Sequence, residues 1–216
     1  SIECVLFDRD GTLIDTAPDF VAAVKQLLAE HGKPPLSCDS IYHRVSDGAR
    51  ALVKLAFGID ENHAEFIQLN QRLLDLYYQQ LQVTDAALYP GLDGLLTKLE
   101  RQQIPWGIVT NKPEKYTNLL LDKLNLSARC GTLVCPDHVS HRKPHPEPIL
   151  LACQQLGVGT ERTVYIGDHQ RDIEAAKNAD VIAIAAAYGY LARDTKIEEW
   201  MADFILNSAD QTEALL

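Results

Sequence analysis

Two aspartates one residue apart end the first apolar segment of the chain. The sequence VLFDRDGT places Asp8 and Asp10 directly after Val-Leu-Phe, and Gly11 and Thr12 follow at once. Neighbouring carboxylates repel each other unless a cation or hydrogen bonds offset their charge. An Asp-Gly turn with local hydrogen bonds would account for these residues. A cation shared by the two acids would account for them as well, so other segments must decide.

Further polar residues follow later apolar segments in the same manner. Thr110 and Asn111 come at the end of IPWGIVT, and Asp168 ends TVYIGD, with Asp172 shortly after it. Lys143 lies in the loop RKPHPEP. In open α/β sheets, ligands bind beyond the carboxyl ends of the strands. We therefore expect these side chains to gather with Asp8 and Asp10 at one edge of a sheet.

The apolar segments alternate with helical patterns along most of the chain. Besides the first segment, the expected strands are 104–110, 132–135, 163–168, 181–187 and 202–206. The expected helices are 92–102, 114–125, 146–156 and 170–179. The strands are short, apolar almost throughout and rich in Val and Ile, as is typical of strands covered on both faces of a parallel sheet. The sequence therefore predicts an α/β fold with a largely parallel sheet.

One stretch departs from this alternation. From about residue 17 to residue 82 the periodicity is helical throughout, and no strand is predicted there. Tyr89-Pro90-Gly91 then returns the chain to the α/β pattern. The sequence thus predicts two domains, an α/β core formed by residues 1–16 and 87–216 and an inserted helical domain formed by residues 17–86.

The polar set has the chemistry of a phosphoryl-transfer site. A carboxylate such as Asp8 can attack phosphorus, and Asp10 can protonate the leaving oxygen and later deprotonate water. Mg²⁺ would offset the repulsion between carboxylate and phosphate, held by Asp8, Asp168 and the backbone carbonyl of Asp10. Lys143 offers a positive charge for the phosphate, and the Thr110 hydroxyl and adjacent backbone N–H groups can bind its other oxygens.

The motifs DRDGT, TN, RKPHPEP and GDHQRD occur in an order that resembles the haloacid dehalogenase superfamily of phosphatases. Within it, the chain looks most like the phosphoglycolate phosphatase-like enzymes. The resemblance covers nearly the whole chain and implies a Rossmann-like parallel-sheet hydrolase core with an inserted all-helical cap. It also implies a small phosphorylated substrate of the phosphoglycolate or N-acetylmuramic acid 6-phosphate type.

The resemblance assigns a role to each motif residue. It implies Asp8 as nucleophile, Asp10 as acid/base, and Asp8, Asp10 and Asp168 as Mg²⁺ ligands. The phosphate contacts that it implies are Thr110, Asn111 and Lys143, while Asp172 supports the metal through water. In the cap, Arg50 follows the turn Ser46-Asp47-Gly48 at a place that the family uses to face the active site. We expect Arg50 to bind a carboxylate of the substrate, although a solvated helix arginine explains it equally well.

Three residues depart from the commoner family pattern. Arg9 replaces a usually apolar residue between the two aspartates, and alternation along an extended chain would point it away from both acids. His145 and His169 stand where acids or small polar residues are frequent. The core roles do not depend on these positions, but His169 beside the metal site can alter its charge and pH dependence.

Composition limits the possible partners and compartment. The net charge is −10, which argues against nucleic acid or an anionic membrane as partner. Five scattered cysteines without a C-x-x-C pair suit a reducing cytoplasm, and no leader or membrane-spanning stretch is apparent. Cys135, His138, His141 and His145 have spacings that superficially suit zinc, but Cys135 ends a strand and Lys143 lies inside the run.

Two other functions would fit the same fold. A phosphomutase of the same superfamily would need a bisphosphorylated activator. A non-catalytic module that only binds phosphorylated ligands would be expected to lack Asp8, Asp10 or Lys143, and all three are present. The sequence therefore favours a magnesium-dependent phosphomonoester hydrolase.

Overall fold

The computed structural model describes residues 1–215 and contains a six-stranded parallel sheet. The strand order is β5-β4-β1-β6-β7-β8, with neighbouring pairs parallel throughout. The strands are β1 (Cys4–Phe7), β4 (Trp106–Val109), β5 (Thr132–Val134), β6 (Thr163–Gly167), β7 (Ile182–Ala186) and β8 (Phe204–Leu206). The prediction of an α/β fold with a parallel sheet is confirmed.

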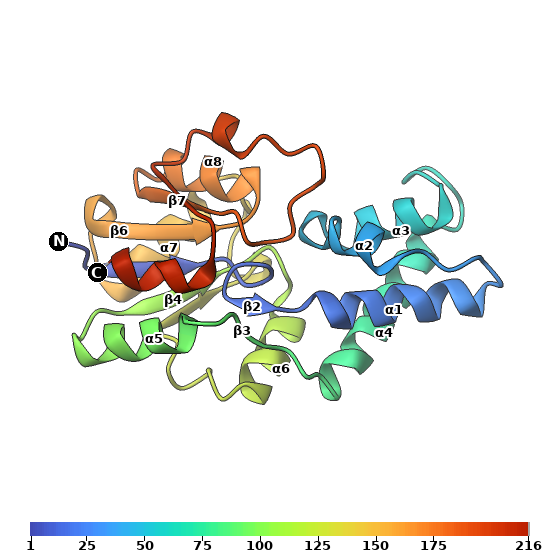
Figure 1. The fold of residues 1–216 in the computed structure, drawn as a ribbon, viewed down its shortest axis with the longest axis horizontal. Helices are drawn as coiled ribbons and strands as arrows, with labels where there is room; N and C mark the ends of the chain where they lie inside the picture. Colours follow the sequence, from blue (N-terminus) through green and yellow to red (C-terminus); the bar gives the residue numbers. More distant parts are fainter. Residues whose placement is uncertain (216) are drawn as a thin grey trace.

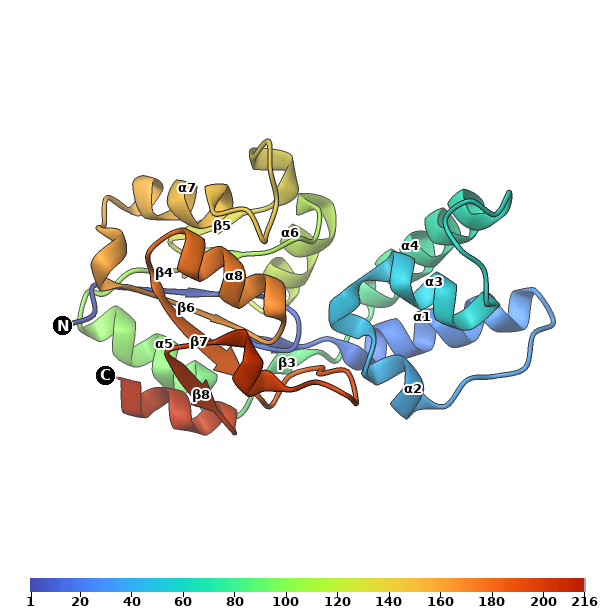
Figure 2. The same ribbon diagram turned by 90° about the horizontal axis from the view of Figure 1, so that it is seen from above.

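Helices cover both faces of the sheet because its central strands are apolar on both sides. Val5 and Phe7 of β1 belong to one hydrophobic cluster, and Cys4 and Leu6 belong to the other. Helices α5 (Leu92–Arg101) and α6 (Glu114–Lys123) pack into the first cluster, and α7 (Glu147–Leu156) and α8 (Gln170–Asn178) pack into the second. Figure 2 shows α5 on one side of the sheet and α7 and α8 on the other.

A block of four helices lies beyond the carboxyl ends of the strands (Figure 1). It consists of α1 (Ala17–Glu30), α2 (Cys38–Tyr42), α3 (Ala49–Phe57) and α4 (Phe66–Gln82), and we call residues 17–82 the helical block. The termini lie at the opposite end of the molecule (Figures 1 and 2). The polar motif residues lie at the carboxyl-end edge of the sheet, and this edge therefore faces the helical block.

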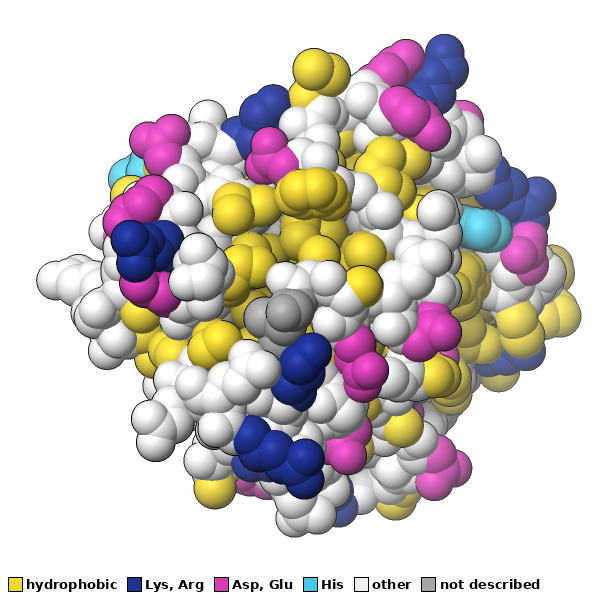
Figure 3. All heavy atoms as spheres, turned by 60° about the vertical axis from the view of Figure 1, so that its left-hand side comes forward, with side chains coloured by type: hydrophobic (Ala, Val, Ile, Leu, Met, Phe, Trp, Pro, Cys, Tyr) yellow, Lys and Arg dark blue, Asp and Glu magenta, His cyan; other side chains and the backbone are white. Residues whose placement is uncertain are grey.

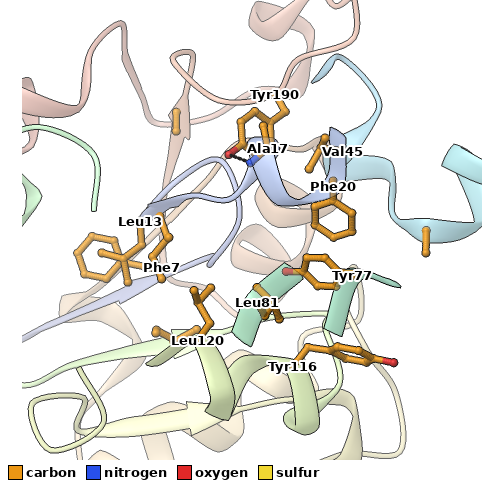
Figure 4. Packing of buried hydrophobic residues seen from close by; sticks show 14 of the residues in the cluster. Phe7, Leu13, Ala17, Phe20, Val45, Tyr77, Leu81, Tyr116, Leu120 and Tyr190 are labelled. Carbon is orange, nitrogen blue, oxygen red and sulfur yellow. Dashed lines mark hydrogen bonds between the residues drawn. The ribbon is translucent and has the colours of Figure 1, made fainter. Parts of the chain in front are cut away.

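The chain enters and leaves the helical block through a short ribbon that the sequence did not reveal. β2 (Ile14–Asp15) pairs antiparallel with β3 (Ala87–Leu88), and each has only two residues, too few to show a period. Tyr190, which follows β7, secures the start of α1. Its hydroxyl accepts hydrogen bonds from the backbone N–H groups of Thr16 (2.7 Å) and Ala17 (2.9 Å), so that a core residue caps a helix of the block (Figure 4).

The outer surface of the core carries charges of both signs. On the end of the molecule that holds the termini, lysine and arginine side chains lie close to acidic ones, with exposed hydrophobic side chains between them (Figure 3). The described helices include none that has both the length and the apolar character required to cross a bilayer.

Candidate active site

A buried lysine lies at the centre of the polar cluster. Lys143 is 3% exposed, and its ammonium contacts Asp8 Oδ1 at 3.1 Å and Asp172 Oδ1 at 2.7 Å. The Tyr165 hydroxyl at 2.7 Å and the Val109 carbonyl at 3.0 Å complete its surroundings. The structure thus joins three predicted site residues from β1, the 140–146 loop and α8 around one positive charge.

Three carboxylates of the cluster could hold a cation. Oxygen atoms of Asp8, Asp168 and Asp172 lie within 4.8 Å of one another. Asp168 Oδ2 accepts hydrogen bonds from Ser46 Oγ (2.6 Å) and the Tyr190 backbone N–H (2.9 Å), whereas Asp168 Oδ1 is buried without a partner among residues 1–215. Because a buried carboxylate oxygen rarely stays unpaired, and because the donors are all hard oxygens, the residues fit a divalent cation such as Mg²⁺.

The electrostatics of the cluster agree with this fit. Burial, followed by the charge of the neighbouring Asp172, raises the pKa of Asp8 to about 6. Burial and the Asp8 carboxylate likewise raise the pKa of Asp168 well above its usual value. Burial lowers the pKa of Lys143, but the two carboxylates that it contacts outweigh burial and raise it. The cluster holds three carboxylates, and the Lys143 ammonium contacts two of them, so an excess of negative charge is left for a cation to balance.

Glycine is required where the backbone approaches these acids. Gly11 has φ +73°, in the left-handed region, and a Cβ added there would lie 2.2 Å from Asp168 Oδ2. Gly11 of the DRDGT motif is therefore needed both for the turn conformation and for the close approach of the chain after β1 to Asp168.

Alternation along an extended chain predicts that Arg9 points away from both acids, and this prediction is wrong. The residue follows β1, where the backbone turns, and its guanidinium folds back onto the carboxylate of Asp10 with contacts of 2.9–3.2 Å. Burial alone would raise the pKa of Asp10, but Arg9 and the nearby Lys112 lower it below its usual value. The two aspartates thus have separate cationic partners, Lys143 for Asp8 and Arg9 for Asp10.

Thr110 and Asn111 lie at the end of β4, next to the cluster. The side-chain amide of Asn111 accepts from the Lys143 backbone N–H (3.1 Å) and donates to the Lys143 carbonyl (2.9 Å). The Thr110 hydroxyl accepts from the Lys112 backbone N–H at 3.0 Å. The Asn111 side chain therefore anchors the loop that carries Lys143, which the sequence pattern did not indicate.

A pocket of about 540 Å³ connects the cluster with the helical block. Asp8, Asp10 and the residues of the 110–113 turn line its core side. Arg50, Asn70 and Leu74 line its block side. Arg50 is 54% exposed, its guanidinium pairs with Glu61 at 2.9 Å, and it lies over the Phe66 ring. The structure thus brings Arg50 to the pocket, but with an acidic partner of its own.

The helical block also contacts the acid cluster directly. Besides the bond from Ser46 to Asp168, Asp47 Oδ1 lies 2.9 Å from His169 Nε2. Both block residues belong to the Ser46-Asp47-Gly48 turn that precedes α3. The His169 side chain therefore contacts the helical block, while its backbone N–H donates to Asp172 Oδ2 of the acid cluster at 3.1 Å. Sequence reasoning assigned no role to four residues near the site, Ser46, Asp47, Tyr165 and Asn70. The first three reach the site through contacts distant in sequence, and Asn70 lines the pocket.

The four residues with zinc-like spacing do not form one site. In the described chain, the ligand atoms that gather near this loop belong to His141, His145 and Glu147. The Glu147 carboxylate already accepts from the backbone N–H groups of Ser140 and His141, both at 2.9 Å. Cys135 is buried, and its backbone N–H donates to the His138 ring. A structural role for these residues in holding the loop agrees with all of these contacts.

The family model of haloacid dehalogenase-like hydrolases matches residues 5–186. The chain belongs to this family. It is 42% identical over 206 residues to an N-acetylmuramic acid 6-phosphate phosphatase of Pseudomonas aeruginosa, with 95% of this chain and 91% of the relative covered. It is 39% identical over 207 residues to a phosphoglycolate phosphatase of Xanthomonas campestris pv. campestris, with 96% and 93% covered.

A solved structure shares the fold of this family member. The crystal structure of a predicted phosphoglycolate phosphatase from Haemophilus somnus superimposes with a TM-score of 0.86 and 24% sequence identity, covering 99% of this chain and 97% of the other. The resemblance to the haloacid dehalogenase superfamily that the four motifs indicated is confirmed.

We expect Mg²⁺ to stabilise the protein against heat more strongly at about pH 7.5 than at about pH 5. The pKa of Asp8 is raised from 3.8 to about 6, so the free energy of unfolding of the metal-free protein falls as the pH rises from about 3.8 to about 6. At a pH below about 6, protons compete with the cation for the oxygens of Asp8. Differential scanning fluorimetry with and without Mg²⁺ measures both effects.

Two variants locate the cation in this experiment. Asp168→Asn should lose most of the Mg²⁺-dependent rise in melting temperature, because it removes a ligand charge. Asp19→Asn is the control, since Asp19 is also a buried acid but pairs with Thr84 on the block side of the ribbon. Equal Mg²⁺ responses in both variants would place the cation elsewhere.

Proposed function

We propose that this protein is a magnesium-dependent phosphomonoester hydrolase that works through an aspartyl-phosphate on Asp8. The observation that carries the proposal is the position of Asp8. Asp8 directly follows β1, and its side chain is 14% exposed and lines the pocket. The Lys143 ammonium lies 3.1 Å from Asp8 Oδ1. Family membership and the names of the relatives support the same reaction class.

The reaction proceeds in two half-reactions. An oxygen of Asp8 forms a bond to phosphorus while the bond to the leaving oxygen breaks and Asp10 supplies a proton to that oxygen. Water then attacks the phosphorus, Asp10 takes its proton, and inorganic phosphate leaves Asp8. Mg²⁺ held by Asp8, Asp168 and the Asp10 carbonyl, and supported by Asp172, would neutralise phosphate charge.

The remaining motif residues bind and orient the phosphate. Lys143 provides positive charge next to Asp8, and its position is fixed by Asn111. The Thr110 hydroxyl and the Asn111 backbone N–H bind the other oxygens, in the manner of strand-to-helix turns. The helical block acts as the cap that excludes bulk water from this chemistry, since its residues line the pocket opposite the acids.

The pocket favours a sugar phosphate over a two-carbon one. At about 540 Å³ it has the volume of sites that enclose ligands well above the size of phosphoglycolate. Asn70 Oδ1, on the block side, is buried, and none of the residues that the structure describes donates a hydrogen bond to it. Phosphoglycolate carries only acceptor groups outside its phosphate at neutral pH, whereas a sugar such as N-acetylmuramic acid carries hydroxyl and amide donors. We therefore place N-acetylmuramic acid 6-phosphate first among the substrates.

We expect the protein to hydrolyse N-acetylmuramic acid 6-phosphate with a higher kcat/KM than phosphoglycolate in the presence of Mg²⁺. Asp8→Asn should lower turnover of every phosphate ester by roughly 10³-fold or more, because no other nucleophile reaches the phosphorus. Steady-state phosphate release measures both. Near-normal turnover by a deamidation-free Asp8→Asn protein would contradict the mechanism, and a preference for phosphoglycolate would contradict the substrate.

Arg50 is expected to recognise the carboxylate of the substrate. Arg50→Ala should lower kcat/KM about ten- to a hundredfold for N-acetylmuramic acid 6-phosphate, the usual effect of losing a charge-assisted hydrogen bond, and have little effect on p-nitrophenyl phosphate. Lys54→Ala is the matched control, because Lys54 pairs with the same Glu61 (2.8 Å) but is not among the described residues that line the pocket. Equal losses on both esters would show that Arg50 only supports the fold or seating of the cap.

A further inference from the structure

Arg9 is a fully buried cation with no role in the chemistry described so far. It is 0% exposed and one of the largest completely buried side chains of the protein. Burying a guanidinium is costly unless every part of it is paired. Its partners therefore show what this residue does.

One side of the guanidinium fixes one oxygen of Asp10. Oδ1 of Asp10 accepts from Arg9 Nε (3.1 Å), from Arg9 Nη2 (2.9 Å) and from the Thr16 hydroxyl (2.6 Å). Within the described part of the chain, Oδ2 receives one longer contact, 3.2 Å from Arg9 Nη2. Since Asp10 lines the pocket, this arrangement saturates Oδ1 and leaves Oδ2 as the oxygen with free lone pairs.

The other side of the guanidinium contacts two helices. Nη2 donates to the Tyr77 hydroxyl of α4 at 2.6 Å, and Nη1 lies 3.4 Å from the Thr117 hydroxyl of α6. The Tyr77 ring stacks on Phe20 of α1, with ring centroids 3.9 Å apart (Figure 4). Arg9 thereby connects Asp10 to α4 of the helical block, to α1 through the Tyr77 ring, and to α6 of the core.

We propose that Arg9 is a positioning residue for the second half-reaction, in which it orients Asp10 so that Oδ2 deprotonates the attacking water, with Tyr77 holding Arg9 in place. The inference rests on the proposed function. In this step Oδ2 takes a proton from water, the water oxygen bonds to phosphorus, and the phosphorus–oxygen bond to Asp8 breaks. Inorganic phosphate and the free Asp8 carboxylate result, and the proton from water is on Asp10 at the end of the step.

The proposal makes a kinetic distinction that a structural role would not make. With p-nitrophenyl phosphate, the leaving group departs without needing a proton, so kcat/KM reports attack by Asp8 alone. Loss of Asp10 orientation then slows only the release of phosphate from Asp8. Since general acid–base catalysis contributes about 10²- to 10⁴-fold, losing the orientation should cost a substantial part of it.

Two variants and one control form the test. Arg9→Met should lower kcat on p-nitrophenyl phosphate about tenfold or more while kcat/KM changes less than about threefold, and a burst of p-nitrophenol should precede the steady state. Tyr77→Phe, which removes only the hydroxyl that holds Arg9 and keeps the Arg9 and Asp10 residues themselves, should lower kcat about three- to tenfold. Tyr78→Phe, the neighbouring tyrosine of α4, should change neither constant.

Several results would overturn the proposal. If Arg9→Met fails to fold, Tyr77→Phe alone decides, and unchanged kinetics in that variant would refute the role. Equal falls in kcat and kcat/KM, without a burst, would make Arg9 a structural residue only. If the wild-type protein hydrolyses no phosphate ester, the proposed function fails instead, so the two failures are distinguishable.

Discussion

The active site depends on one buried ammonium group. Lys143 lies between Asp8 and Asp172, and the backbone carbonyl of Val109 and the hydroxyl of Tyr165 hold it there. Without this charge, two carboxylates would face each other inside the protein, and breaking such a buried pair typically costs about 3–5 kcal/mol. The same group ties β1, β4, β6 and α8 together at the edge of the sheet. The contacts of Lys143 therefore serve both the active site and the packing of the strands around it.

A second cation extends this arrangement to the helical block. Arg9 neutralises Asp10 and reaches Tyr77, while Ser46 contacts Asp168 from the other side of the pocket. Asp168 is thus bonded directly to the helical block, and Asp10 is linked to it through Arg9. A shift of the helical block relative to the sheet would change the contacts of Asp10 and Asp168, and under the proposed mechanism this would link substrate enclosure with chemistry.

The sequence was sufficient for those features that depend on local patterns. Apolar strands with polar residues after them predicted the parallel sheet, and family motifs predicted which acids and which lysine would gather. The two-residue strands β2 and β3 were too short to show a period. The Arg9 interaction was missed because alternation holds only while the chain is extended, and the chain turns after Phe7. Tyr165 and Ser46 carry no local signal, since only the tertiary fold brings them to Lys143 and Asp168.

The central claim is that phosphate is transferred to Asp8 before it reaches water. The most direct measurement is an acid quench during turnover of p-nitrophenyl phosphate, followed by borohydride reduction and mass spectrometry of the peptide that contains Asp8. Reduction converts an acyl phosphate to the alcohol, so Asp8 should be recovered as homoserine in the quenched wild-type protein and as unmodified aspartate without substrate. Unmodified Asp8 in a protein that is quenched while actively releasing phosphate, or modification at another carboxylate, would contradict the account.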